Sequence, residues 1–411
     1  MSSIKKVGVV AAGVSAALLI AACSSSGSSS SSSSSSAPAG GATSSSSSSA
    51  SAPSISVSDL NNSFSALQQL SSLASSGKGS VAVILPDTTS STRYVEFDAP
   101  YLKAAFAAAG LSSSDLIVQN ALGSDATQFS DAQSDITKGA TVLIVDPLDS
   151  GTGAHIESYA KSQGVAVIDY DRLTLGGTRS YYVSFDNVQV GKVMAQGLVS
   201  CVKDWGVKDP NVIFMKGAST DNNATLFAQG SQQVLQPLFS STWKEVSQPA
   251  GTWDPPTALS EFQQQYTAHK NINAALIPND ENGAPIIHYL QTQGIKPKTF
   301  PTTGQDATLT GLQNVLAGYQ CGTVYKPIYL EAGATAALAM YVRAGQTPPS
   351  SLVNGSTQDS TAHTSVPSIL LSPEWVTSAN INSTIIADKF VPAAQLCKGY
   401  TAACSAAGIA G

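Results

Sequence analysis

Hydrophobic residues occur along this chain in short runs that alternate with longer amphipathic stretches. In the first half, runs rich in Val and Ile span residues 81–85, 116–118, 141–145 and 165–168. The stretches between them repeat apolar residues at helical spacing, over residues 94–109, 125–138 and 154–163. Continuously apolar strands separated by amphipathic helices are typical of a parallel sheet covered by helices on both faces. The first half therefore predicts an α/β domain of this kind.

The alternation returns in the second half, with apolar runs at residues 212–215, 274–277 and 322–325. These are more strands than one ordinary sheet holds, and the chain of 411 residues is longer than a single core of about 250–300 residues. We therefore predict two doubly wound, Rossmann-like lobes. In such sheets, ligands bind at the carboxyl ends of the strands.

A further apolar run lies at the N-terminus and is typical of a targeting segment. Lys5 and Lys6 precede residues 7–22, which are apolar or small and too few for a comfortable membrane span of about 20 residues. The run ends in LIAAC at residues 19–23, which resembles the lipobox of bacterial lipoproteins and implies a lipid on the thiol of Cys23. The alternative is an ordinary signal peptide followed by a chance cysteine. We predict a lipoprotein signal peptide over residues 1–22.

Serine dominates the segment that follows, with 20 of the 31 residues from Ser24 to Ser54. Such a segment buries too little apolar surface to offset the entropy of ordering it, so it is expected to form a flexible coil. We place this tether at residues 23–58, with the apolar rhythm of the folded part starting at about Ile55. An anchor and a tether predict an extracytoplasmic protein held at the outer face of the cell membrane.

The composition of the chain argues against three classes of function: nucleic-acid binding, metal binding and nucleotide binding. The net charge of −6 argues against nucleic-acid binding, which normally requires a basic patch. Five cysteines and four histidines lie scattered, without the spacing of metal ligands, and no glycine pattern of a nucleotide site is complete. We therefore expect no metal and no cofactor.

Polar side chains gather where the predicted strands end. They are carboxylates, amides, guanidinium groups and an ammonium group, at Arg93, Asp171, Arg172, Asn223, Asn279, Asp306 and Lys326. Planar groups of this kind suit vicinal hydroxyls, each of which donates and accepts a hydrogen bond. Trp253 or Tyr94 offers an aromatic face for the C–H face of a sugar ring. The alternative for each carboxylate or amide is that it only caps the following helix.

Several motifs closely resemble the D-xylose-binding proteins of bacterial ABC transporters. They are VIDYDR at 167–172, YVSFDN at 182–187, DNNA at 221–224, GQDA at 304–307 and VYKPI at 324–328. The resemblance runs from about Gly79 to about Ile386 and implies a type I periplasmic binding protein, whose two lobes are joined by three crossing hinge segments. We accordingly expect an N-terminal lobe of 59–184 plus 324–364, a C-terminal lobe of 185–323 plus 365–396, and a tail of 397–411.

The resemblance also implies a set of sugar contacts. They are Arg93, Asp171, Arg172, Asn223, Trp253, Asn279, Asp306 and Lys326, and Tyr94 stands where the family pattern has tryptophan. A tyrosine there has a smaller face and adds a hydroxyl. The loop 87–92 also departs from the family pattern.

With Cys23 lipidated, four cysteines remain, an even number suited to an oxidising compartment. Cys397 and Cys404 lie close together and are expected to pair, which leaves Cys201 with Cys321. Sequence alone permits three connectivities, and four free buried thiols are the other possibility.

The favoured function is a non-enzymatic receptor that captures a monosaccharide, D-xylose foremost, for an ABC permease and its cytoplasmic ATPase. Glucose, arabinose or ribose are alternative ligands, and we expect a monomer. A secreted glycoside hydrolase is less favoured, because Arg172 and Lys326 beside Asp171 and Asp306 would keep both carboxylates ionised and hinder a general acid. A sugar-responsive repressor would begin with a basic helix-turn-helix, where this chain has its targeting segment.

Overall fold

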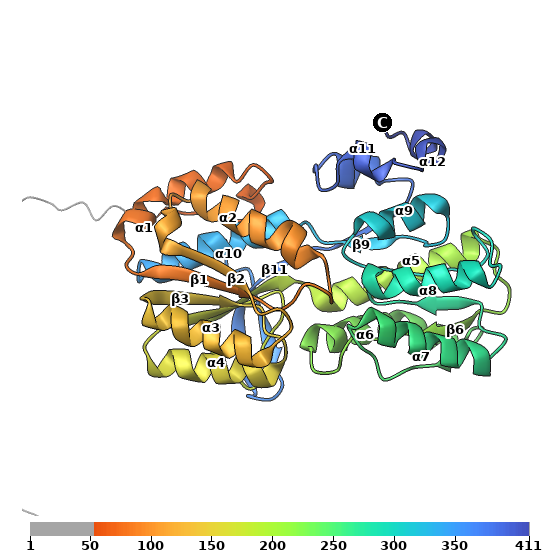
Figure 1. Ribbon diagram of the computed structural model, residues 1–411, viewed down its shortest axis with the longest axis horizontal. Helices are drawn as coiled ribbons and strands as arrows, with labels where there is room; N and C mark the ends of the chain where they lie inside the picture. Colours follow the sequence, from red (N-terminus) through yellow and green to blue (C-terminus); the bar gives the residue numbers. More distant parts are fainter. Residues whose placement is uncertain (1–52, 411) are drawn as a thin grey trace, which may run out of the picture. The chain divides into compact units, whose positions relative to one another are not determined.

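The computed structural model describes residues 53–410. Their first lobe is built on a seven-stranded sheet in the order β10-β11-β5-β4-β3-β1-β2 (Figure 1). Every pair in it is parallel except the antiparallel edge strand β10 on β11. The strands are β1 (Ser80–Leu85), β2 (Leu116–Asn120), β3 (Ala140–Val145), β4 (Ala166–Tyr170), β5 (Tyr181–Phe185), β10 (Gly355–Asp359) and β11 (Thr364–Leu371).

Helices cover both faces of this sheet, as the continuous apolar runs predict. Figure 1 shows α3 and α4 on one face and α1, α2 and α10 on the other. In β1, Val81, Val83 and Leu85 belong to one buried cluster, and Ala82 and Ile84 to another. Strand side chains alternate between faces, so both faces must be apolar. The helices are α1 (Ser71–Ser76), α2 (Ala99–Ala108), α3 (Asp125–Thr137), α4 (Ser150–Ser162) and α10 (Ile328–Arg343).

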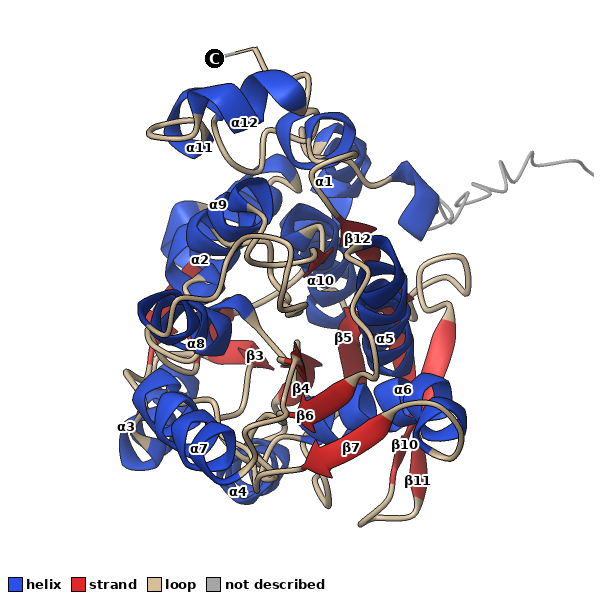
Figure 2. Ribbon diagram, turned by 90° about the vertical axis from the view of Figure 1, so that its right-hand side faces the viewer, coloured by secondary structure: helices blue, strands red, loops and turns tan. Residues whose placement is uncertain are grey.

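The second lobe has a smaller sheet in the order β7-β6-β8, with β6 and β7 side by side in Figure 2. Single bridges continue it from Ala275 to Thr302 and from Gln305 to Val324, and β9 pairs antiparallel with β12. Its strands are β6 (Asn211–Phe214), β7 (Lys244–Ser247), β8 (Ala274–Leu276), β9 (Thr323–Tyr325) and β12 (Glu374–Val376). Its helices are α5 (Asn187–Asp204), α6 (Asn222–Phe239), α7 (Pro255–Ala268), α8 (Asp280–Thr292) and α9 (Leu309–Ala317).

The chain passes between the lobes three times: from β5 to α5, from β9 to α10, and from β11 to β12. Two passages differ from the expected boundaries, which lay after residues 323 and 364. Residues 324–325 still belong to the second lobe, because β9 pairs with β12 there. All of β11 belongs to the first lobe, because residues 368–371 pair with 182–185 of β5. The chain therefore leaves that lobe only after Leu371.

The folded region also begins earlier than the expected tether boundary at residue 58. Ile55 is 1% exposed and joins the main apolar cluster. Its carbonyl accepts a hydrogen bond from Ser351 at 3.0 Å, and the backbone N–H of Val57 donates to the carbonyl of Ser351. Short helical turns follow at η1 (Val57–Asp59) and η2 (Ser65–Leu70). The predicted signal peptide, Cys23 and most of the tether lie outside the described residues.

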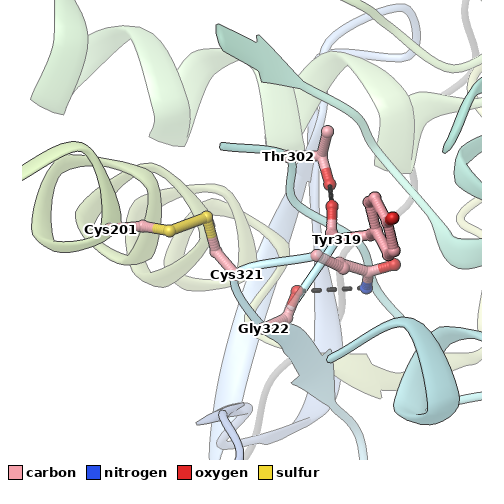
Figure 3. Close-up of a disulfide and its surroundings, with 6 residues drawn as sticks. Cys201, Thr302, Tyr319, Cys321 and Gly322 are labelled. Atoms are coloured by element: carbon pink, nitrogen blue, oxygen red, sulfur yellow. Dashed lines mark hydrogen bonds between the residues drawn. A yellow bond between two sulfur atoms is a disulfide. The ribbon is translucent and has the colours of Figure 1, made fainter. Parts of the chain in front are cut away.

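Both expected disulfides are present. Cys201 on α5 joins Cys321 just before β9, as Figure 3 shows. Cys397 joins Cys404 between α11 (Ala393–Leu396) and α12 (Thr401–Ala406). The C-terminal segment is folded against the second lobe, with Leu396 and Ile409 buried in the main cluster. The remaining short turns are η3 (Tyr94–Asp98), η4 (Ser113–Asp115) and η5 (Asn382–Ile386).

Within residues 53–410, no helix combines the length and apolar character needed to cross a bilayer. The same residues contain no group of three or more potential metal-binding side chains.

Candidate functional site

A single cavity between the lobes is lined by all nine residues that the sequence singled out for ligand contact. Strand ends and helix starts deliver them there, because the carboxyl ends of both sheets face the same cleft. The first lobe contributes Arg93, Tyr94, Asp171 and Arg172, and the second contributes Asn223, Trp253, Asn279, Asp306 and Lys326. Five further lining residues were not in that set: Ser90, Ser91, Asp221, Phe227 and Gln305.

Arg93 is held by three carboxylates. Its Nη2 lies 2.7 Å from Asp98 and 2.6 Å from Glu331, and its Nη1 lies 3.0 Å from Asp171. Burial alone would lower the pKa of Arg93, but Asp171, Asp98 and Glu331 outweigh it and raise the pKa well above its usual value. The guanidinium is therefore charged and fixed in orientation. Asp98 and Glu331 were missed from sequence, although Glu331 is a lone carboxylate in the otherwise apolar start of α10.

Asp171 is the carboxylate at the centre of the site. Burial would raise its pKa, but Arg93, Lys326 and Arg172 outweigh that effect and lower the pKa to about 2. The residue has a φ of 57°, in the left-handed region that non-glycine residues rarely adopt. Its carbonyl accepts hydrogen bonds of 2.8 Å from Tyr182, Ser184 and Asn223, which hold this conformation.

The sequence suggested that Arg172 pairs with its neighbour Asp171. The two side chains do not form this ion pair. The Nε of Arg172 lies 3.5 Å from Asp221 and 3.7 Å from Asp146, whereas Asp171 pairs with Arg93. The reason is the backbone turn at Asp171, which sends consecutive side chains in different directions. Asp171 is nevertheless kept ionised, because Arg93, Lys326 and Arg172 together lower its pKa.

Tyr94 connects these two groups through its hydroxyl. The hydroxyl donates to Asp171 Oδ2 at 3.0 Å and accepts from Arg172 Nη2 at 3.0 Å. Both guanidinium groups, of Arg93 and Arg172, lie 5.5 Å from the ring centre, within cation–π range. The ring is 2% exposed. Tyr94 thus organises the charges of the first lobe in addition to lining the cavity.

Lys326 and Asp306 form the second charge pair, at 3.0 Å. Burial would lower the pKa of Lys326, but Asp306 and Asp171 raise it above its ordinary value. Asp306 also accepts a hydrogen bond of 3.1 Å from Ser91 in the other lobe. The pair therefore lies where it can contact both a bound ligand and the opposite lobe.

Trp253 is partly buried and contributes an aromatic face to the cavity. Its indole N–H donates to Asp221 Oδ2 at 2.9 Å, which fixes the ring. Gly217 leaves space for it, because a Cβ at that position would lie 2.1 Å from the indole ring. A ring held in this way can stack on a sugar.

Side chains already bridge the lobes directly. Asn279 donates to the carbonyl of Ser90 at 3.0 Å, in addition to the contacts of Arg172 with Asp221 and of Ser91 with Asp306. The remaining space is about 20 Å³, which suffices for roughly one water. A ligand larger than a water molecule therefore enters only when the lobes move apart, and its polar groups would then replace several of these contacts.

Two α/β lobes around a polar interdomain cavity define a cleft-type binding protein. Residues 81–347 match the model of the periplasmic binding protein domain. The chain is 35% identical to the D-xylose-binding periplasmic protein of Escherichia coli over 285 residues, 68% of this chain and 83% of the relative. It is 29% identical to the multiple sugar-binding periplasmic receptor ChvE of Rhizobium radiobacter, over 78% of this chain and 92% of that one.

Solved structures agree with this assignment. A carbohydrate transporter solute-binding protein from Chloroflexus aurantiacus, in complex with D-glucose, superposes with a TM-score of 0.67 at 25% identity. The match covers 77% of this chain and 97% of that one. The chain therefore belongs to the periplasmic binding protein family, with the type I fold.

Proposed function

We propose that this protein is an extracytoplasmic receptor that captures a monosaccharide, D-xylose foremost, and delivers it to an ABC import system. The carrying observation is the cavity between the lobes, where fixed charges, amides and an indole face converge. The carboxyl oxygens of Asp171 and Asp306 accept hydrogen bonds from hydroxyls, whereas Arg172, Lys326 and Asn279 donate to them. Trp253 offers its face to the ring.

Relatives support the sugar class more firmly than the particular sugar. Two D-xylose-binding periplasmic proteins, from Escherichia coli and Haemophilus influenzae, are 35% and 34% identical to this chain. Other relatives are named as multiple sugar-binding and ribose import proteins. Sugar binding for transport is thus common to them, and none of these names describes an enzyme.

The carboxyl groups of the cavity also argue against a function in glycoside hydrolysis. A glycoside hydrolase needs one carboxyl group that carries a proton at working pH. The pKa of Asp171 is lowered to about 2, and Asp306 is paired with Lys326. Both suit hydroxyl binding better than proton donation.

Capture operates by closure of the lobes. Ligand contacts from both lobes favour the closed state, and the permease would recognise that state. We further propose that the protein works as a monomer and that a lipid on Cys23 keeps it near the permease.

Calorimetric titration with xylose, arabinose, ribose and glucose tests the proposal. We expect xylose to bind at least about tenfold tighter than glucose, because the exocyclic CH2OH of glucose would overpack a pentose cavity by about 1–3 kcal/mol. Glucose binding as tightly as xylose would contradict the pentose assignment but leave the sugar receptor intact. The absence of binding by every sugar would contradict the function itself.

A further inference from the structure

Glu281, the second residue of α8, reaches across the cleft to the first lobe. Its Oε1 accepts the backbone N–H of Thr92 at 2.8 Å and lies 3.3 Å from the hydroxyls of both Thr92 and Ser91. Its Oε2 accepts from Asn279 in its own lobe at 3.2 Å. Glu281 is absent from the lining of the sugar cavity.

The loop of residues 87–92, which Glu281 contacts, is also held in shape by hydrogen bonds within the first lobe. Asp87, at the start of the loop, accepts the backbone N–H groups of Thr89 and Ser90 at 2.7 and 2.6 Å. It also accepts the hydroxyl of Ser90 at 2.6 Å. Asp87 thus shapes the loop from the side of the first lobe, and Glu281 holds its far end from the second. Ser90 and Ser91, which lie in this loop, line the sugar cavity.

A second carboxylate competes for the same donor. The hydroxyl of Ser91 lies 3.1 Å from Asp306 and 3.3 Å from Glu281, but it has one proton to donate. Asp306 has Lys326 as a partner at 3.0 Å, whereas no cation lies within ion-pairing distance of Glu281 among the described residues. Of these two carboxyl groups, Glu281 is therefore the one whose charge no cation offsets when the lobes close.

We propose that Glu281 is a positioning residue that holds loop 90–92 across the cleft, so that closure of the lobes over the sugar takes up a proton. The inference rests on the proposed sugar-binding function. A protonated carboxyl keeps its carbonyl oxygen for the N–H of Thr92 and removes the repulsion from Asp306.

The electrostatics of the closed lobes agree with this. Burial, then Asp306 and Asp280, raise the pKa of Glu281 to about 8, against an ordinary value of about 4.3 expected once the lobes part. Protonation of Glu281 therefore favours the closed state in full when the pH is below the open-state pKa of about 4.3. This contribution declines as the pH rises further and is lost once the pH passes the closed-state pKa of about 8.

Two other carboxylates lie near Glu281, and neither bridges the lobes. Asp280 binds Thr308, Gln320 and Thr323, all within the second lobe, so its surroundings persist when the lobes open. Glu281, Asp280 and Thr92 line a surface groove of about 330 Å³, and Glu96 of the first lobe lies in this groove and is exposed. Glu96→Gln therefore removes a neighbouring charge without removing the contact, and serves as the matched control.

Calorimetry of xylose binding in buffers of different ionisation enthalpy tests the proposal. Between about pH 5.5 and 7.5, we expect the wild type to take up close to one more proton than Glu281→Gln, and its affinity to fall by up to about tenfold per pH unit relative to that variant. Glu96→Gln should behave as the wild type does. Glu281→Ala, which cannot accept from Thr92, should bind several-fold more weakly than Glu281→Gln. Equal proton uptake by wild type and Glu281→Gln would overturn the proposal.

A sugar-free readout keeps this test separate from the proposed function. By small-angle scattering without ligand, the wild type should have a larger radius of gyration at about pH 9 than at about pH 6, whereas Glu281→Gln should change less. An identical response of the two proteins would contradict the role of Glu281, whichever sugar binds. If no sugar binds but the two respond differently, the function is wrong and the role of Glu281 stands.

Discussion

Buried charges at the cleft have little freedom to move, and each has a specific partner. Arg93 is shared among Asp98, Glu331 and Asp171, and Lys326 pairs with Asp306. Taking such groups out of water is costly unless they are paired and hydrogen-bonded. The pairs orient the groups before a ligand arrives, which reduces the entropy lost on binding.

Removal of either partner of the Lys326–Asp306 pair should weaken sugar binding. We expect Lys326→Ala and Asp306→Ala each to lose about ten- to a hundredfold in xylose affinity, because a charge-assisted hydrogen bond contributes about 1.5–3 kcal/mol. Calorimetry measures the loss, and thermal melting checks that the variants are folded. Lys161→Ala, on the exposed face of α4, is the control and should bind normally. Unchanged affinity in both cleft variants would refute the site.

Gly217 controls the position of Trp253. In Gly217→Ala, the new methyl group would lie 2.1 Å from the indole, so the ring must shift. We expect weaker xylose binding and an altered tryptophan emission spectrum. Gly283→Ala is the control, because its Cβ would meet atoms only at 3.8 Å and beyond. If Gly217→Ala bound xylose as the wild type does, Trp253 would not be a contact of the sugar.

Elements of the second lobe are tied together by the Cys201–Cys321 disulfide. It links α5 to the segment just before β9 (Figure 3). Helix α5 follows the first passage between the lobes, and β9 precedes the second passage. Trp375 of β12 packs between them, since a Cβ at Gly197 or Gly322 would lie 2.2 or 2.7 Å from its ring. The three segments of this lobe that lead to the hinge are thereby packed into one unit.

The two disulfides should differ in their effect on stability. The two cysteines of Cys201–Cys321 are 120 positions apart in the sequence, whereas those of Cys397–Cys404 are only 7 apart. On the chain-entropy account, their removal costs about 5 and about 2.5 kcal/mol respectively. Urea unfolding of the two double Cys→Ser variants measures both values. A larger loss from the short loop would contradict the entropic account for this protein.

At the scale of the whole molecule, the proposed function depends on movement of the two lobes and on where the protein is held. The segment predicted to anchor the protein lies outside the described residues, so Cys23 is tested by fractionation. We expect Cys23→Ser to shift the protein from the membrane to the soluble fraction or the medium, because the variant would lack the proposed thioether-linked lipid. Persistence of the variant in the membrane fraction would place the anchor elsewhere.

The sequence predicted seven of the twelve strands found in residues 53–410 and the two-lobe fold, and with the family resemblance it gave the nine residues that meet in the cleft. It did not predict β5, β7, β10, β11 and β12. The predicted features depend on local periodicity and on motifs at strand ends, and parallel strands bring their carboxyl ends together wherever the sheet forms. Cysteine parity and proximity likewise led to both disulfides.

Tertiary structure decided which partners these residues have. Arg93 pairs with Asp171 from 78 residues away and with Glu331 from 238, distances along the chain over which no local pattern acts. The assignment of β11 to the first lobe depends on its pairing with β5, and the contact of Glu281 with Thr92 requires both lobes to be folded. Local periodicity specifies an element, whereas the neighbours of a buried charge follow from how distant elements pack.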